Sequence, residues 1–230
     1  MKIKGATTVS GGSLGRVTDD SGGCGAKVDH GGLAGRIGGC RLCAGRFAQT
    51  ATAHAPRPVV WFAPSARLLV AGQAPGARVH ASGIPFSDAS GDRLRNWLGL
   101  DAGAFYDLAR VAIVPMAFCF PGYDARGSDL PPPAVCAQTW RAEVMASLPD
   151  LRLTLAVGGA AIRWHLGAGS VSDRVADWRA TVAETAVFPL PHPSWRNTGW
   201  LKRNPWFARD LLPDLKLAVA GALAAPARAL

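Results

Sequence analysis

The sequence predicts an α/β protein in which a central, mostly parallel, four-stranded sheet lies between two layers of helices. Four short segments are almost continuously apolar, and stretches with helical periodicity lie between them. Strands that are apolar on both faces are typical of parallel sheets that helices cover on both sides. The predicted strands are residues 66–73, 110–117, 151–158 and 186–191, and the predicted helices are residues 89–99, 134–148, 159–167 and 204–224.

The first 39 residues differ in composition from the rest of the chain. They are rich in Gly, Ser and Thr, and they show the periodicity of neither a helix nor a strand. A segment of this kind buries too little apolar surface to offset the entropy lost on folding. We therefore expect residues 1–39 to form a disordered or loosely docked leader. Residues 40–230 are expected to form a single domain, because the whole chain of 230 residues is short for two domains.

Three of the four predicted strands run directly into loops that are polar or rich in Gly and Pro. These loops are residues 72–76, 119–122 and 191–194. In parallel sheets of this class, ligands bind beyond the carboxyl ends of the strands. We therefore expect the three loops to meet at one edge of the sheet and to carry the functional site.

The chain is strongly basic, with 25 Lys and Arg against 16 Asp and Glu and a formal net charge of +9. This balance favours a polyanionic partner, because each phosphate that is neutralised releases condensed counterions. A GC-rich genome also enriches arginine, so charge alone leaves both explanations open. No apolar run reaches the roughly 18 residues needed to cross a bilayer, and no secretory signal opens the chain. We expect a cytoplasmic monomer that does not bind membranes.

The first of these loops continues into residues 85–91, where an aromatic and an acidic side chain follow a proline. Glycines such as Gly72 let backbone N–H groups approach a flat ligand closely. Phe86, which Pro85 restrains, is well placed to stack on a base. Asp88 immediately precedes the predicted helix 89–99, so helix capping is the structural alternative to a catalytic role.

The last loop, residues 192–206, interleaves aromatic side chains with cations and amides. Exposed aromatic rings are costly without a ligand. On DNA, cations hold phosphates while a bulky side chain fills the vacated base stack. The alternative is that Trp195, Trp200 and Trp206 are core residues, and we expect this of at least one of them.

Four of the five cysteines form two spaced pairs, Cys40-x2-Cys43 and Cys119-x16-Cys136. A reducing compartment argues against disulfides. The spacing suits a site of four thiolates, and zinc and a [4Fe–4S] cluster compete on spacing alone. Four buried free thiols are the remaining alternative. Cys24 lies in the predicted leader and is expected to take no part.

Together these motifs resemble the uracil-DNA glycosylase superfamily, most closely its iron–sulfur branches, the fourth and fifth families. Residues 72–76 with 83–86 are similar to the first motif of the superfamily, and residues 192–194 to the second. The His-x-Ser-x-x-Asn-Thr frame of residues 192–198 is similar to the fifth family in particular. The four cysteines match the cluster ligands in order and spacing. The resemblance spans about residues 40–215 and implies a uracil-DNA glycosylase-like fold.

The resemblance implies a DNA-repair glycosylase that flips uracil out of single- or double-stranded DNA, with other deaminated bases as further candidate substrates. The enzyme hydrolyses the N-glycosidic bond and leaves an abasic site. In this family pattern Phe86 stacks on the flipped base, and His192 donates a hydrogen bond to uracil O2. The cysteines hold a structural [4Fe–4S] cluster. The implied base-binding residues are Gly72, Gln73, Ala74 and Phe86, the DNA-binding residues are Ser194, Trp195, Arg196, Asn197, Lys202 and Arg203, and the metal ligands are Cys40, Cys43, Cys119 and Cys136.

The chain departs from each branch of the family at defined positions. Ala74 stands where the classical enzymes have an aspartate, and Gln73 where the fourth family has a glutamate. Pro115 stands where the fourth family has an asparagine that reads uracil. Asp88 corresponds to an aspartate of the fifth family, although the segment from Phe86 to Asp88 is one residue shorter than in that pattern. In these positions the chain resembles an intermediate between the fourth and fifth families.

Breaking an N-glycosidic bond builds positive charge on the sugar and negative charge on the departing base. An anion near the sugar and a donor at the base oxygen are therefore needed. Asp88 and His192 are the acid and the histidine that lie in the two motif loops, so they are the predicted catalytic pair, with Asp92 and His80 in reserve. The rival interpretations are a non-catalytic nucleic-acid-binding module and a zinc-stapled nucleotide hydrolase, for which no phosphate loop is present.

Overall fold

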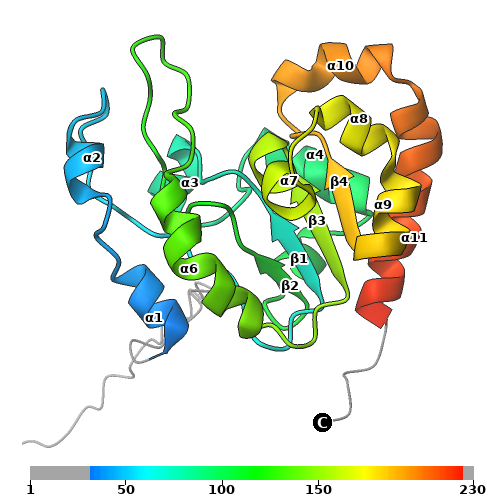
Figure 1. The fold of residues 1–230 in the computed structure, drawn as a ribbon, viewed down its shortest axis with the longest axis horizontal. Coiled ribbons are helices and arrows are strands. Elements are labelled where there is room, and N and C mark those ends of the chain that lie inside the picture. Colours follow the sequence, from blue (N-terminus) through cyan, green and yellow to red (C-terminus); the bar gives the residue numbers. More distant parts are fainter. Residues whose placement is uncertain (1–31, 225–230) are drawn as a thin grey trace, which may run out of the picture.

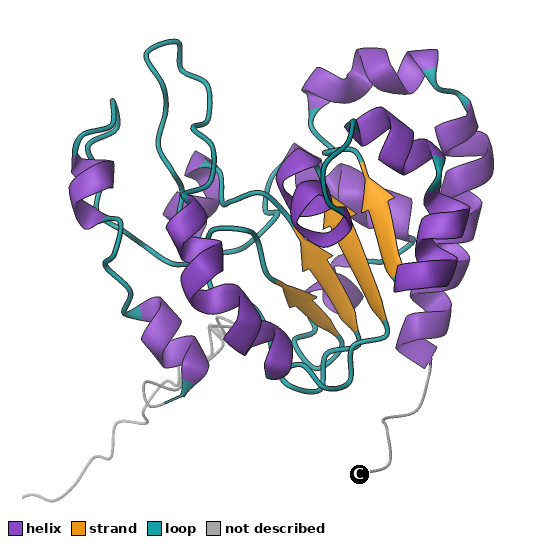
Figure 2. Ribbon diagram, viewed as in Figure 1, coloured by secondary structure: helices purple, strands orange, loops and turns teal. Residues whose placement is uncertain are grey.

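The computed structural model describes residues 32–224, and it contains the predicted parallel sheet. The four strands are β1 (Leu68–Ala71), β2 (Val111–Ile113), β3 (Leu153–Val157) and β4 (Val187–Leu190). All neighbouring pairs are parallel, and the order across the sheet is β2-β1-β3-β4. The arrowheads in Figure 2 point towards the same end of the molecule, so the loops that follow the strands gather there.

Helices cover both faces of this sheet (Figure 1), which confirms the three-layer α/β/α prediction. Helices α6 (Ala134–Ala146) and α7 (Gly159–Leu166) lie in front of the sheet, and α4 (Ala89–Leu98) lies behind it. Helix α11 (Leu212–Ala224) packs against α4, β1 and β3, and α5 (Ala102–Tyr106) contacts β2. The shorter helices are α2 (Ala44–Ala48), α3 (Ala77–Ser82), α8 (Val171–Ala176), α9 (Trp178–Thr185) and α10 (Thr198–Arg203).

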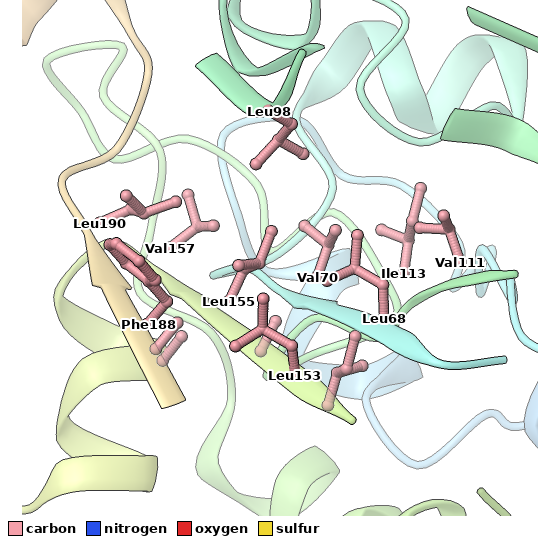
Figure 3. Packing of buried hydrophobic residues seen from close by; sticks show 14 of the residues in the cluster. Leu68, Val70, Leu98, Val111, Ile113, Leu153, Leu155, Val157, Phe188 and Leu190 are labelled. Atoms are coloured by element: carbon pink, nitrogen blue, oxygen red, sulfur yellow. The ribbon is translucent and has the colours of Figure 1, made fainter. Parts of the chain in front are cut away.

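The core lies between these layers because every residue of the four strands is buried. Leu68, Val70 and Leu155 project from the central strands, and Leu98 of α4 approaches them (Figure 3). Each fully buried aliphatic side chain contributes about 1.5–3 kcal/mol relative to an exposed one. Burial on both faces explains why the strands are continuously apolar in the sequence rather than alternating.

The elements are shorter than the sequence pattern suggested. The predicted strand 66–73, for example, is only Leu68–Ala71. The predicted helix 204–224 is present, and it consists of a π-helical turn at Phe207–Leu211 that runs directly into α11. Helices α2, α3, α8, α9 and α10 have only five to eight residues each. Helices of one or two turns show too little periodicity to be recognised.

The predicted leader needs a correction at its carboxyl end. Helix α1 (Leu33–Gly38) lies within residues that were expected to be disordered or loosely docked. Ile37 is completely buried, and Arg36 pairs with Glu143 of α6 and lies 5.8 Å from the ring of Trp140. This segment therefore belongs to the domain, and its glycine-rich surroundings hid it. Residues 1–31, including Cys24, lie outside the described part of the chain.

Within residues 32–224, no helix has the length and apolar character that crossing a membrane requires.

Candidate active site

The loops at the carboxyl ends of the strands enclose one cleft of about 580 Å³. This volume falls in the range of about 300–1,000 Å³ that is usual for ligand sites. The predicted first-motif loop, the loop after β2 and the loop after β4 all contribute, as the parallel topology required. The lining includes Gly72, Gln73, Ala74, Phe86, Asp88, Pro115, Asp129, His192, Ser194, Trp195, Arg196 and Asn197.

Asp88 lines the cleft and also caps α4. Its Oδ1 accepts a hydrogen bond from the backbone N–H of Gly91 at 3.1 Å, which satisfies one of the free donors of the first turn. Among the described residues this is the one hydrogen bond of the Asp88 carboxylate. The carboxylate is thus fixed in direction by the helix while its second oxygen stays available. The capping role and a role in the cleft are compatible.

His192 follows β4, and its imidazole is held in one tautomer. The backbone N–H of Ser194 donates to Nδ1 at 3.2 Å, so the proton of the neutral ring resides on Nε2. Burial lowers the pKa of His192, against the opposite influence of the Asp88 and Asp129 carboxylates. The ring is therefore neutral near pH 7, with an Nε2–H donor.

Two further contacts fix the position of His192. The side-chain amide of Asn197 donates to the His192 carbonyl at 2.7 Å. Gly158, at the end of β3, has a left-handed φ of +83°, and a Cβ there would lie 3.4 Å from the His192 Cβ. The backbone between β3 and α7 thus packs directly against the histidine. Asn197 was predicted to bind DNA, yet its amide nitrogen is already engaged in holding this loop.

The predicted DNA-binding residues fall into two groups. Ser194, Trp195, Arg196 and Asn197 line the cleft, and the Trp195 side chain is 76% exposed. Lys202 and Arg203 instead lie exposed at the end of α10 and do not line the cleft.

Two of the three tryptophans in this loop are structural. Trp206 stacks on Trp178 with ring centroids 5.7 Å apart, and Trp200 contacts Trp206 edge-on at 5.8 Å. The core interpretation therefore holds for Trp200 and Trp206, whereas Trp195 is free to meet a ligand.

A comparison with known families agrees with this geometry. The sequence model of the family described as the Uracil DNA glycosylase superfamily matches residues 59–216, which is more than half of the chain. The chain belongs to the uracil-DNA glycosylase superfamily. Membership supports glycosylase activity on DNA, with DNA as the substrate. The matched region includes both catalytic candidates and Cys119 and Cys136, and it begins after Cys40 and Cys43.

The four cysteines of this superfamily member line a second, separate cavity. Cys40 and Cys43 lie between α1 and α2, Cys119 follows β2, and Cys136 is in α6. Burial, with the neighbouring cysteines as a second cause, raises the pKa of Cys119 to about 12. Burial likewise raises the pKa of Cys136 to about 11. Within residues 32–224 no group of three or more His, Cys, Asp and Glu is arranged to hold a metal ion.

The residues named in reserve do not line the glycosylase cleft. Asp92 pairs with Arg95 at 2.5 Å, and His80 packs edge-on against His54 with centroids 5.1 Å apart. His165 of α7 was not among the candidates, and it contacts the buried Arg141, with 2.6 Å between Nε2 and Nη2. The contacts of these side chains are with other protein groups outside the cleft, which indicates a structural role.

Sequence reasoning missed three residues of this site. Asp129 lines the cleft from the loop that joins β2 to α6, and its backbone bridges Tyr123. Arg93 of α4 donates to the Ser194 carbonyl at 3.0 Å and so ties the helix that Asp88 caps to the second motif. Gly158 packs against His192. The one signal for Asp129 was its place in a loop that follows a predicted strand, at the edge where the motifs meet.

Proposed function

We propose that this protein removes uracil from DNA by hydrolysing the N-glycosidic bond. The observation that carries the proposal is the convergence of Phe86, Asp88 and His192 on one cleft at the carboxyl ends of the strands. A protein that only binds DNA needs neither a carboxylate oriented towards the cleft nor a histidine held in one tautomer. The proposal includes uracil as the substrate base, a [4Fe–4S] cluster as the metal centre, and membership of an iron–sulfur branch of the superfamily.

The reaction places opposite charges at the two ends of the breaking bond. The bonding electron pair moves to the base nitrogen, and the sugar carbon becomes positive. A water oxygen then bonds to that carbon, and the proton released by the water neutralises the departing base. Fixed charges and donors that match these developing charges lower the barrier, because they need no reorganisation during the reaction.

Asp88 supplies the negative charge next to the sugar. Its hydrogen bond to the Gly91 N–H fixes one oxygen. The other oxygen can accept a hydrogen bond from the attacking water. The carboxylate is half-buried in the cleft, so its field is screened less than in bulk water.

His192 supplies the donor at the base oxygen. Since the Ser194 N–H occupies Nδ1, the neutral ring presents Nε2–H. A neutral donor can stabilise an anionic base without giving up its proton. Removing one donor of this type costs about 10²–10³-fold in rate.

The DNA surface follows from the same loop. Trp195 is exposed beside the cleft, and the Arg196 guanidinium lies 5.9 Å from its ring. We infer that Trp195 fills the space that the flipped nucleotide leaves in the base stack, while Arg196 contacts phosphate. Lys202 and Arg203 of α10 would hold phosphates further along the strand.

We also propose that Cys40, Cys43, Cys119 and Cys136 hold a [4Fe–4S] cluster, which places the chain in an iron–sulfur branch of the superfamily. The four side chains share one cavity. Burial raises the pKa of Cys119 and of Cys136, and such thiols become thiolates when a bound metal centre supplies positive charge. A four-iron cluster takes its thiolates on separate irons, so it suits a wider site than a single zinc ion does. The cluster would join α1, α2 and α6 to the sheet as a structural brace.

The deciding experiment uses labelled oligonucleotides that carry uracil, hypoxanthine or a thymine mismatch, followed by alkaline cleavage of abasic sites. We expect excision of uracil under single-turnover conditions. We expect His192→Ala to slow excision about 10²–10³-fold while the affinity for an uncleavable DNA analogue stays the same. Tight DNA binding without excision of any of these bases would instead support the non-catalytic module.

A further inference from the structure

Phe86 has a backbone conformation that is unusual for its residue type. Its φ is +53°, in the left-handed region, and Ala53 and Ala186 are the other non-glycine residues with positive φ among residues 32–224. A bulky side chain avoids this region because its Cβ approaches the following carbonyl. Such strain persists only where surrounding contacts hold it. Phe86 is also the residue that would stack on a flipped base.

The carbonyl oxygen of Phe86 is held by two donors. The Tyr106 hydroxyl donates to it at 3.0 Å, and Nη1 of Arg95 donates at 3.2 Å. Arg95 Nη1 also contacts the Tyr106 oxygen at 3.0 Å, which closes a triangle. Burial raises the pKa of Tyr106, so its hydroxyl stays protonated and remains a donor.

Gly91 permits this arrangement by having no side chain. A Cβ on Gly91 would lie 1.8 Å from the Phe86 carbonyl oxygen, far inside any tolerable contact. The first turn of α4 is thus pressed against the strained peptide. The ring itself rests edge-on against Phe105, with centroids 6.1 Å apart and an interplanar angle of 83°. On another side it approaches Gly72, where a Cβ would be 3.5 Å from Phe86 Cζ.

We propose that Arg95 and Tyr106 are positioning residues that hold the Phe86 ring ready to stack before DNA arrives. This inference rests on the proposed function, because it assumes that a flipped base is what the ring meets. Holding the ring in advance avoids the entropy of ordering it during binding. Neither residue lines the cleft, so each acts through Phe86 rather than on the substrate.

The test is a double-mutant cycle with a matched control. Tyr106→Phe deletes only the hydroxyl, and Tyr123→Phe makes the same change at the other tyrosine of the chain, whose hydroxyl forms no hydrogen bond among the described residues. For Tyr106→Phe we expect a rise of about three- to tenfold in the half-saturating concentration in single-turnover excision, as the loss of one hydrogen bond gives. The maximal rate should change less. Tyr123→Phe should match the wild type.

The cycle separates positioning from general destabilisation. In a Phe86→Ala background, Tyr106→Phe should have no further effect on excision, because the ring through which it acts is gone. Independent, multiplying effects of the two substitutions would overturn the proposal. Arg95→Met should behave as Tyr106→Phe does in both backgrounds.

A second readout does not depend on activity. In protein labelled with fluorophenylalanine, the ¹⁹F resonance of Phe86, assigned by Phe86→Leu, should shift or broaden in Tyr106→Phe and stay unchanged in Tyr123→Phe. An unchanged Phe86 resonance in Tyr106→Phe would refute the positioning role. A wild-type protein that excises none of the test bases would refute the proposed function instead, so the two failures are distinguishable.

Discussion

Asp88 has two roles that different substitutions can separate. Asp88→Asn keeps an oxygen that accepts from the Gly91 N–H, and asparagine is as good an N-cap as aspartate. It removes the negative charge. Asp88→Ala removes both the cap and the charge. Comparing the two variants therefore tests whether the carboxylate acts on the reaction or only on helix α4.

The expected magnitudes differ for the two roles. Loss of the cap costs about 1 kcal/mol, which for a domain of this size corresponds to about 2–4 °C in Tm. Two opposite unit charges about 4 Å apart interact by about 4 kcal/mol at the effective dielectric of a partly buried site. Removing the anion should therefore slow excision about 10³-fold. Asp88→Asn should show the loss of rate without the loss of Tm, and Asp88→Ala should show both.

The measurements are single-turnover excision of uracil and thermal unfolding, with Asp101 as the matched control. Asp101 caps α5 in the same way, accepting from the Ala104 N–H at 2.7 Å, and it does not line the cleft. Asp101→Ala should lower Tm and leave excision unchanged. If Asp88→Asn excises uracil at the wild-type rate, Asp88 is only a cap, and Asp129 becomes the next carboxylate to test.

Three further predictions concern stability, metal and DNA. Burial lowers the pKa of His165 to about 4 from an unfolded value near 6.5, so the free energy of unfolding should fall by up to about 3 kcal/mol as the pH drops across that interval. In urea titrations His165→Gln should lose this acid sensitivity, and an equal pH response in both proteins would contradict the assignment. Anaerobically purified protein should contain iron and absorb broadly near ~400 nm; Cys119→Ser should lose the iron and Cys24→Ser should retain it, whereas zinc without iron would disprove the cluster. Lys202→Gln should reduce the slope of log Kd against log salt by about 1, while Lys216→Gln on α11 should leave the slope unchanged. An unaltered slope for Lys202→Gln would show that Lys202 does not contact phosphate.

The sequence by itself determined the sheet and the edge where the site forms. Segments such as residues 151–158 are apolar because both faces of β3 are buried, and a pattern of that kind is visible in a single stretch of chain. Parallel strands end at the same edge, so the meeting of Asp88 and His192 followed from topology alone. The sequence pattern also identified the four cysteines that share a cavity.

Only the tertiary structure decided which neighbours complete that site. Asp129 and Gly158 reach His192 from two other loops, and Arg95 and Tyr106 hold the Phe86 carbonyl from α4 and α5. Apart from the place of Asp129 in a loop after a predicted strand, these residues carry no local signature, because their roles depend on contacts between segments far apart in the chain. Helix α1 was hidden for the same reason: the burial of Ile37 and the pairing of Arg36 with Glu143 exist only once α6 is in place. Local patterns report how a segment satisfies its own backbone and its own apolar face, whereas the charge and shape of a site arise from the packing of segments against one another.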